Sequence, residues 1–322
     1  MKKNDIWAFL IHLSWHMWDD PSSQAWGMYL KPGWSDDNEC DLEVWDNVIR
    51  QLPEYGINTV VIDVGDAVQY DSHPEISAPD AWSKAFLRQK LDEIRALGMT
   101  PIPKLNFSAC HDAWLKHYGR MVSTPQYYQV CADLIEEVCE IFDRPALFHL
   151  GMDEETDYYQ RNNEMTVCRN GALWEHDLEF FCAQCEKHGA RPWIWSAFLT
   201  KFHREYLETK CSHNILMSTG YYRKIENNLS EQKVLPQDII GPDQVELLDR
   251  LGFEQVVLTS TWGYKNSTLQ MLRLAQDKVD PSRLLGFITA PWLKTEKREL
   301  HGLLHGACKL YYEREKVFPE SL

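Results

Sequence analysis

One pattern of residues recurs along the chain and constrains its fold more than any other feature. An amphipathic stretch with helical spacing ends at a glycine, and a short run of β-branched and apolar residues follows directly. The pattern occurs at residues 53–63, 95–107, 186–197 and 249–260, with Gly56, Gly98, Gly189 and Gly252 as its glycines. Glycine enters the left-handed conformation that ends many helices without a Cβ penalty, so each repeat predicts a helix followed by a strand.

Four further runs have strand character without such a glycine, namely residues 5–13, 145–151, 214–220 and 283–290. Helical patterns lie between the strands, near residues 41–55, 82–97, 125–142, 172–188, 200–210, 242–251, 267–278 and 296–313. Thr124 before Pro125 is typical of a helix start.

Strictly alternating strands and helices require parallel pairing, and eight such repeats close most naturally into a (β/α)8 TIM barrel. The sequence therefore predicts an α/β protein in which residues 1–322 form a single barrel domain. An open doubly wound sheet is the structural alternative. Against it, no glycine-rich phosphate-binding fingerprint follows the first strand.

Charge and composition limit the partners of the chain. Its 33 Lys and Arg against 48 Asp and Glu give a formal charge of -15, which disfavours nucleic acid and anionic membrane surfaces. A small neutral substrate fits this balance better. No apolar stretch reaches the roughly 20 residues of a membrane helix. Asp5 interrupts the apolar run near the N-terminus, so residues 5–13 are interpreted as the first strand and not as a signal peptide.

The cysteines indicate a reducing compartment. There are nine, an odd number without the spacing of a disulfide framework, so the sequence predicts free thiols and a cytoplasmic location. Cys182 and Cys185 lie in a helical pattern without a second pair, which favours buried thiols over a zinc site.

In a TIM barrel the active site is built at the C-terminal ends of the strands, so the residues after each strand are the candidates. Acids follow the early strands and aromatic residues follow the late ones, which is typical of a sugar site because pyranose rings stack on aromatic faces. Asp153 and Glu154 after the fourth strand are the catalytic candidates. The candidate substrate-binding residues are Asp63, His111, His149, Glu155, Trp195, Tyr221, Trp262, Tyr264 and Trp292.

Glycosidases with two protein carboxylates hold them about 5.5 Å apart for retention or about 6.5–9.5 Å apart for inversion. No carboxylate directly follows the sixth, seventh or eighth strand. A 2-acetamido group on the sugar would solve this problem, because its carbonyl oxygen can attack the anomeric carbon. An Asp then orients the amide and the adjacent Glu protonates the leaving group, so no metal or other cofactor is expected.

Residues 149–154 read His-Leu-Gly-Met-Asp-Glu, which resembles the His-x-Gly-Gly-Asp-Glu signature of glycoside hydrolase family 20, the β-N-acetylhexosaminidases. The resemblance implies that Asp153 orients the acetamido group and that Glu154 is the general acid. It extends to the histidine after the third strand, the tryptophans after the fifth and last strands and the acetamido-binding tyrosine, which correspond to His111, Trp195, Trp292 and Tyr264.

The chain also departs from that family. It lacks the sugar-binding arginine after the first strand, and no acid follows Trp195 or Trp292 within two residues. Two alternatives therefore stay open beside a glycosidase. One is a catalytically silent carbohydrate-binding barrel, and the other is a metal-dependent sugar isomerase or amidohydrolase. The oligomeric state and the natural glycoside are left open.

Overall fold

Eight parallel strands close into a barrel in the computed structural model, which describes residues 5–18, 37, 40–160, 165–225 and 240–319. Each strand pairs with the next along the chain, and the eighth pairs with the first. The strands are β1 (Ile6–His12), β2 (Thr59–Asp63), β3 (Thr100–Lys104), β4 (Leu147–His149), β5 (Arg191–Trp195), β6 (Leu216–Ser218), β7 (Gln255–Thr259) and β8 (Leu284–Thr289). The predicted (β/α)8 barrel is confirmed, and every strand lies inside a run that the sequence indicates.

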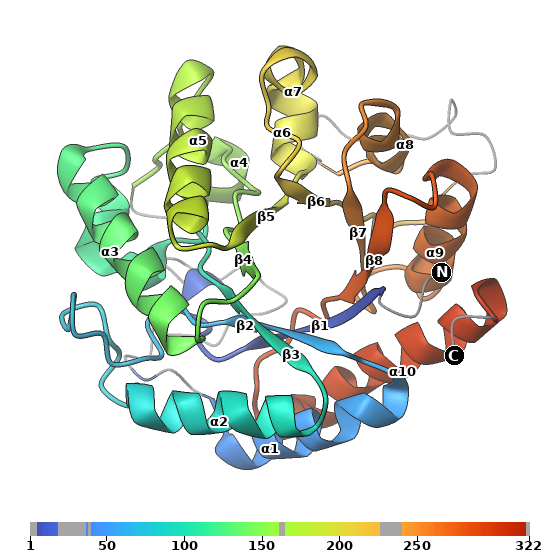
Figure 1. Ribbon diagram of the computed structural model, residues 1–322, viewed down its shortest axis with the longest axis horizontal. Helices are drawn as coiled ribbons and strands as arrows, with labels where there is room; N and C mark the ends of the chain where they lie inside the picture. The colour runs from blue at the N-terminus through green and yellow to red at the C-terminus, as the bar shows by residue number, and fades with distance from the viewer. Residues whose placement is uncertain (1–4, 19–36, 38–39, 161–164, 226–239, 320–322) are drawn as a thin grey trace.

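Helices form an outer ring around these strands (Figure 1). They are α1 (Leu42–Gln51), α2 (Lys84–Ala96), α3 (Pro125–Ile141), α5 (Ala172–Lys187), α6 (Ala197–Phe202), α7 (Arg204–Thr209), α8 (Asp243–Arg250), α9 (Ser267–Lys278) and α10 (Leu300–Val317), with the short α4 (Asp157–Gln160) after β4. In the described part of the chain, none of these helices is long and apolar enough to cross a membrane.

Local sequence signals account for several helix ends. The Thr124 hydroxyl accepts a hydrogen bond from the Tyr127 amide at 3.3 Å and caps α3, as predicted. The four glycines of the recurring pattern have φ values of 64°, 80°, 82° and 85°. Two elements differ from expectation. The helix predicted at 200–210 is divided at His203 into α6 and α7, and the last helix is displaced to Leu300–Val317.

The strands separate two apolar layers. Alternate residues such as Phe9, Val60 and Phe148 face the helices, whereas Leu10 and Trp193 belong to the cluster inside the barrel. Because side chains alternate along a strand, the same parity brings the last residues of β1 to β4 into the barrel interior. These residues are His12, Asp63, Lys104 and His149, which are neighbours in register and buried. A polar floor thus underlies the C-terminal end of the barrel.

Candidate active site

The loop after β4 has an unusual backbone that places the predicted acids. Gly151 and Met152 both have positive φ, 73° and 66°, although Met152 carries a buried side chain. A non-glycine residue in this region is uncommon, and strain of this kind is concentrated at functional sites. The turn is packed against Asn106, whose Nδ2 donates a hydrogen bond to Asp153 Oδ1 at 3.3 Å. Asn106 thereby links the end of β3 to the first predicted catalytic residue.

Gly151 has no room for a side chain. A Cβ there would lie 2.0 Å from Asn106 Oδ1 and 2.9 Å from the Asn106 Cα. We expect Gly151→Ala to lower the free energy of unfolding by about 1–2 kcal/mol through its backbone conformation and by about 1–3 kcal/mol through overpacking. Gly98→Ala is the matched control, since Gly98 has φ 80° with nothing within 4 Å of its Cβ position. Urea denaturation of both variants measures the difference, and equal losses would contradict the clash with Asn106.

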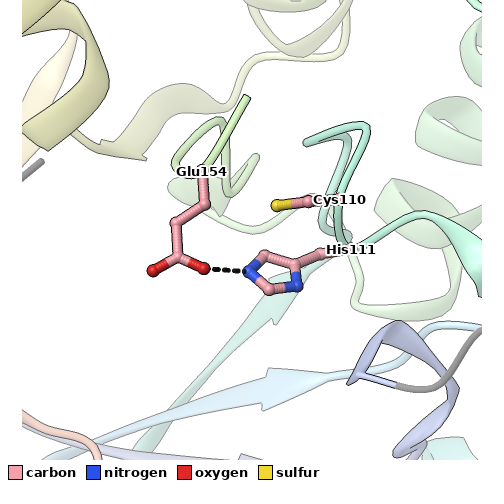
Figure 2. A group of neighbouring side chains, drawn as sticks. All are labelled: Cys110, His111 and Glu154. Carbon is pink, nitrogen blue, oxygen red and sulfur yellow. Dashed lines mark hydrogen bonds and ion pairs between the residues drawn. The ribbon is translucent and has the colours of Figure 1, made fainter. Parts of the chain in front are cut away.

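His111 contacts both acids, and Figure 2 shows its contact with Glu154. Its Nε2 lies 3.0 Å from Glu154 Oε2 and 3.6 Å from Asp153 Oδ2. The side chains of Glu154 and Asp153 are 24% and 16% exposed, whereas that of His111 is 6% exposed. The two carboxyls are therefore only partly exposed, and the imidazole beside them is buried.

The pKa values of this group are shifted by burial and by its mutual charges. Burial lowers the pKa of His111, but the carboxylates of Asp153 and Glu154 have the larger, opposite effect and raise it to about 9. Burial raises the pKa of Glu154, and the hydrogen bond from His111 opposes that rise. An imidazolium thus lies against two carboxyls in different surroundings, which is the condition under which neighbouring acids take different roles.

Cys110, the residue before His111, completes a group of possible metal ligands. Its thiol, a ring nitrogen of His111 and a carboxylate oxygen of Glu154 all lie within 4.8 Å of one another. The thiol is 3.3 Å from the Ser108 hydroxyl, and burial raises its pKa well above the ordinary value. The sequence did not suggest this combination.

Aromatic side chains lie at the ends of the later strands. The ring centroids of Trp195 and Trp292 are 5.7 Å apart, and those of Tyr222 and Trp262 are 5.4 Å apart. Burial raises the pKa of the Tyr222 phenol, a hydrogen bond with Trp292 opposes the rise, and the charges of Glu154 and Asp153 add to it. Tyr222 therefore connects the two aromatic pairs and lies within electrostatic reach of the acids.

The predicted tyrosines occupy different places. Tyr221 is buried in the apolar layer between the strands and the helices, so it does not line the barrel end. Its neighbour Tyr222 packs against the cluster inside the barrel and takes its place in the candidate site. Tyr264 is half-buried, and its backbone amide donates a 2.7 Å hydrogen bond to the Tyr222 carbonyl. The loops after β6 and β7 are joined by this contact.

Asp63 and His149 lie in the polar floor instead of at the surface of the site. Asp63 forms an ion pair with Lys104, and both side chains are buried. Burial raises the pKa of Asp63 to about 6 although the Lys104 ammonium opposes the rise. His149 Nδ1 accepts a hydrogen bond from the Gly151 amide at 3.1 Å, and its ring centroid is 4.1 Å from that of Trp195. His149 thus supports the turn at Gly151 and the ring of Trp195 from inside the barrel, with Asp63 in the same layer.

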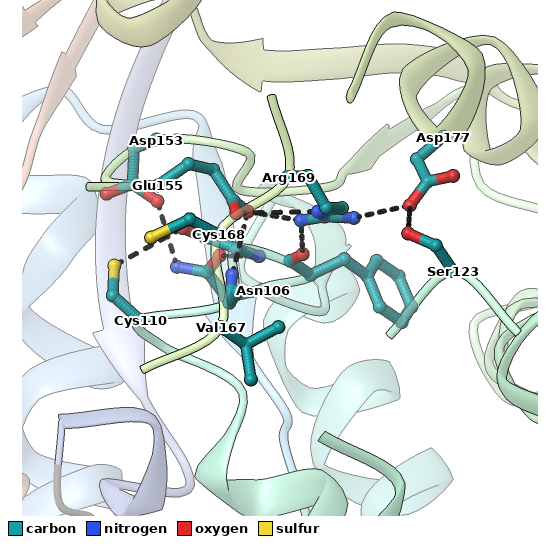
Figure 3. A network of polar contacts seen from close by, with 12 residues as sticks. Asn106, Cys110, Ser123, Asp153, Glu155, Val167, Cys168, Arg169 and Asp177 are labelled. Carbon is teal, nitrogen blue, oxygen red and sulfur yellow. Dashed lines mark hydrogen bonds and ion pairs between the residues drawn. The ribbon is translucent and has the colours of Figure 1, made fainter. Parts of the chain in front are cut away.

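Glu155 belongs to a buried ion-pair network (Figure 3). It pairs with Arg169 and accepts a 2.7 Å hydrogen bond from the Ala109 amide. Arg169 also donates to Asp177 of α5 at 3.1 Å and to the Phe107 carbonyl at 2.6 Å. The carboxylate of Glu155 is thus committed inside the protein, and we do not place it among the residues that contact a substrate.

Solved structures are similar to this chain over nearly its whole length. One is a glycoside hydrolase family 20 exo-β-N-acetylglucosaminidase from Vibrio harveyi, with a TM-score of 0.59 and 14% identity, over 97% of this chain and 58% of that one. Another is a chitobiase from Flavobacterium johnsoniae, with a TM-score of 0.60 and 12% identity, over 97% and 52%. The barrel has the fold of the family 20 catalytic domain.

A β-N-acetylhexosaminidase from Bacteroides fragilis is also similar in fold, with a TM-score of 0.58 and 12% identity over 96% of this chain and 65% of that one. No protein-family model matches the chain, and no curated protein matches it in sequence. The chain spans between 52% and 65% of the length of these three structures. The resemblance predicted from residues 149–154 is therefore confirmed as a likeness of fold to a distant family.

Several residues of the site are not among the predicted catalytic and substrate-binding residues, although Asn106 and Tyr222 follow strands as the candidates do. The alternation of side chains along a strand could have indicated Lys104 and Tyr222. Each lies an even number of residues from an inward-facing residue of its strand, whereas the adjacent residue faces the helices. Arg169 has none, since it lies in a connection and reaches Glu155 and Asp177 only through the fold. Asn106 follows β3 as the candidates do, but its contact with Gly151 depends on the turn.

Proposed function

We propose that this chain is a glycoside hydrolase that releases a β-linked N-acetylhexosamine, or a related 2-acetamido sugar, by a substrate-assisted retaining mechanism. The observation that carries the proposal is the pair of partly exposed carboxyls, Asp153 beside Asn106 and Glu154 beside His111. They lie on a barrel with the family 20 fold, within electrostatic reach of Tyr222.

The steps follow from the surroundings of each acid. The acetamido carbonyl oxygen attacks the anomeric carbon while Glu154 gives its proton to the departing glycosidic oxygen, and the anomeric carbon–oxygen bond breaks. Asp153 orients the amide and stabilises the positive charge that develops on the bicyclic intermediate. Glu154 then removes a proton from water, which opens this intermediate with net retention. His111, which contacts Glu154, positions that carboxyl for both steps.

The surroundings of the other acids near the barrel end favour a mechanism in which the substrate supplies the nucleophile. Asp63 is paired with Lys104, and Glu155 is paired with Arg169. Asp66 accepts a hydrogen bond from the Ser14 hydroxyl, and its other carboxylate oxygen lies 2.6 Å from His16 Nδ1. Asp112 is buried, and burial raises its pKa well above the ordinary value. Each of the four acids is therefore either engaged inside the protein or favoured in its neutral form, which disfavours it as a second catalytic carboxylate.

The test of substrate assistance is an inhibitor that mimics the bicyclic intermediate. We expect the wild-type chain to hydrolyse a chromogenic N-acetylglucosaminide and to bind the thiazoline of N-acetylglucosamine at least about 100-fold more tightly than the free sugar. Asp153→Asn and Tyr264→Phe should each reduce that preference. The corresponding glucoside is the control substrate. Hydrolysis of the glucoside, with thiazoline binding no tighter than glucose, would overturn the mechanism.

The two alternatives make different predictions. A silent carbohydrate-binding barrel would bind the sugar without turnover. A metal-dependent enzyme has one observation in its favour, the group formed by Cys110, His111 and Glu154. That group includes the proposed general acid, and a metal bound to its carboxylate would compete with proton transfer.

A further inference from the structure

Three donor atoms of different chemistry converge at the candidate acid. A thiol sulfur, an imidazole nitrogen and a carboxylate oxygen, from Cys110, His111 and Glu154, lie within 4.8 Å of one another (Figure 2). The proposed hydrolysis uses Glu154 with His111 beside it, and it gives no role to the sulfur. A thiol held at this point therefore calls for a separate explanation.

The donor set matches Zn²⁺. Zinc binds thiolate sulfur at about 2.3 Å, imidazole nitrogen at about 2.0–2.1 Å and carboxylate oxygen at about 2.0–2.2 Å. Small side-chain rotations bring three atoms already within 4.8 Å to such distances. Asp153 Oδ2, 3.6 Å from His111 Nε2, supplies a fourth donor that can complete a tetrahedron.

The electrostatic surroundings also suit a dication. The carboxyls of Asp153 and Glu154 both lie beside Nε2 of His111, and both are largely shielded from water. Attraction between a cation and two carboxylates is strongest where solvent screening is weak. A metal between His111 Nε2 and Glu154 Oε2 would replace the proton now shared over their 3.0 Å contact.

We propose that Cys110, His111 and Glu154 form a Zn²⁺ site, and that bound Zn²⁺ blocks the hydrolysis by occupying the carboxylate oxygen of Glu154 that delivers the proton. Binding releases to the buffer the thiol proton of Cys110, the Nε2 proton of a cationic His111 and, in the form active as a general acid, the carboxyl proton of Glu154, and no atom changes its oxidation state. The inhibition rests on the proposed function, whereas the metal site itself does not.

The site is tested first by direct binding to the metal-free chain, without any substrate. Zn²⁺ titrated by calorimetry should bind once per chain, and Co²⁺ should give the near-ultraviolet charge-transfer band of a metal–thiolate bond. Cys110→Ser keeps a polar group of similar size near Ser108 but removes the thiol. It should lower Zn²⁺ affinity at least about tenfold and abolish the Co²⁺ band, because soft thiolate ligands favour these metals.

Cys168→Ser is the matched control, since Cys168 is also half-buried but belongs to no such group in the described chain. It should keep both the affinity and the band. A wild-type chain without the Co²⁺–thiolate band, or a Cys110→Ser variant with unchanged Zn²⁺ affinity, would overturn the site.

Turnover then tests the inhibition. Zn²⁺ should inhibit hydrolysis of the chromogenic N-acetylglucosaminide by the wild-type chain, EDTA should restore it, and Cys110→Ser should need at least about tenfold more Zn²⁺ for the same inhibition. Activity that falls on chelation and rises with Zn²⁺ would overturn the inhibition and favour a metal-dependent enzyme. A chain that binds Zn²⁺ through Cys110 but has no glycosidase activity would refute the proposed function and leave the metal site standing.

Discussion

Glu154→Gln is expected to lower kcat/KM by about 10²–10⁴-fold on N-acetylglucosaminides with poor leaving groups, because an amide cannot give a proton to the departing oxygen. On activated aryl glycosides, whose leaving groups depart without protonation, the loss should be much smaller. The amide keeps nearly the same size and its contact with His111, which lies 3.0 Å from the carboxylate. Steady-state kinetics on a series of leaving groups measures the difference.

Asp157→Asn is the matched control for this substitution. It makes the same change of acid to amide three residues further on, at an exposed position in α4, and should leave the kinetics unchanged. Equal losses with good and poor leaving groups in Glu154→Gln would remove the general-acid assignment. An inactive wild-type chain that still binds the sugar would instead favour the silent binding barrel.

Arg169→Met is expected to lower the free energy of unfolding by about 3–5 kcal/mol, the usual cost of removing one partner from a buried ion pair. Arg169 lies between Glu155 and Asp177, and the side chains of all three are buried. Methionine fills much of the space but leaves two carboxylates without their cation. The loop that carries Asp153 and Glu154 should loosen as well, because Glu155 anchors it beside Ala109.

Urea denaturation measures this loss, with Arg204→Met as the control. Arg204 pairs with Glu208 on the exposed surface of α7, where such pairs contribute about 0–1 kcal/mol. In a double-mutant cycle, Glu155→Gln should recover part of the loss of Arg169→Met, because it removes one of the unpaired charges. A loss below about 1 kcal/mol for Arg169→Met, or strict additivity in the cycle, would contradict the account of the network.

Much of the fold could be predicted from local patterns, because helix ends and strands depend mainly on residues that are close together in the chain. Alternation of helix and strand requires parallel pairing, and Gly56 or Gly252 ends a helix through its own backbone freedom. Barrel topology then assigns the C-terminal strand ends to the site without any contact being known. The prediction of Asp153, Glu154 and His111 as residues of one site followed from this rule and from the family resemblance.

Strand parity explains the outcome for the two tyrosines and for Lys104. A shift of one residue moves a side chain from the barrel interior to the helix layer, so Tyr221 is in the apolar core and Tyr222 is at the site. The sequence contained this alternation, but β6 has only three residues, so its pattern does not determine which of the two tyrosines beyond it faces inward. Lys104 escaped notice because a lysine at a strand end reads as exposed, whereas Asp63 on the neighbouring strand allows its burial.

By itself the sequence determined the barrel, the strand ends that form the candidate site and the adjacency of Asp153 and Glu154. Only the tertiary structure decided which acids are available to a substrate. Glu155 is paired with Arg169, 14 positions away in the chain, and Asp63 is paired with Lys104, 41 positions away. Only the fold brings the thiol of Cys110 to Glu154, 44 positions away in sequence. Ion pairing and metal ligation act over a few ångströms in space, and the separation of residues along the chain does not encode those distances.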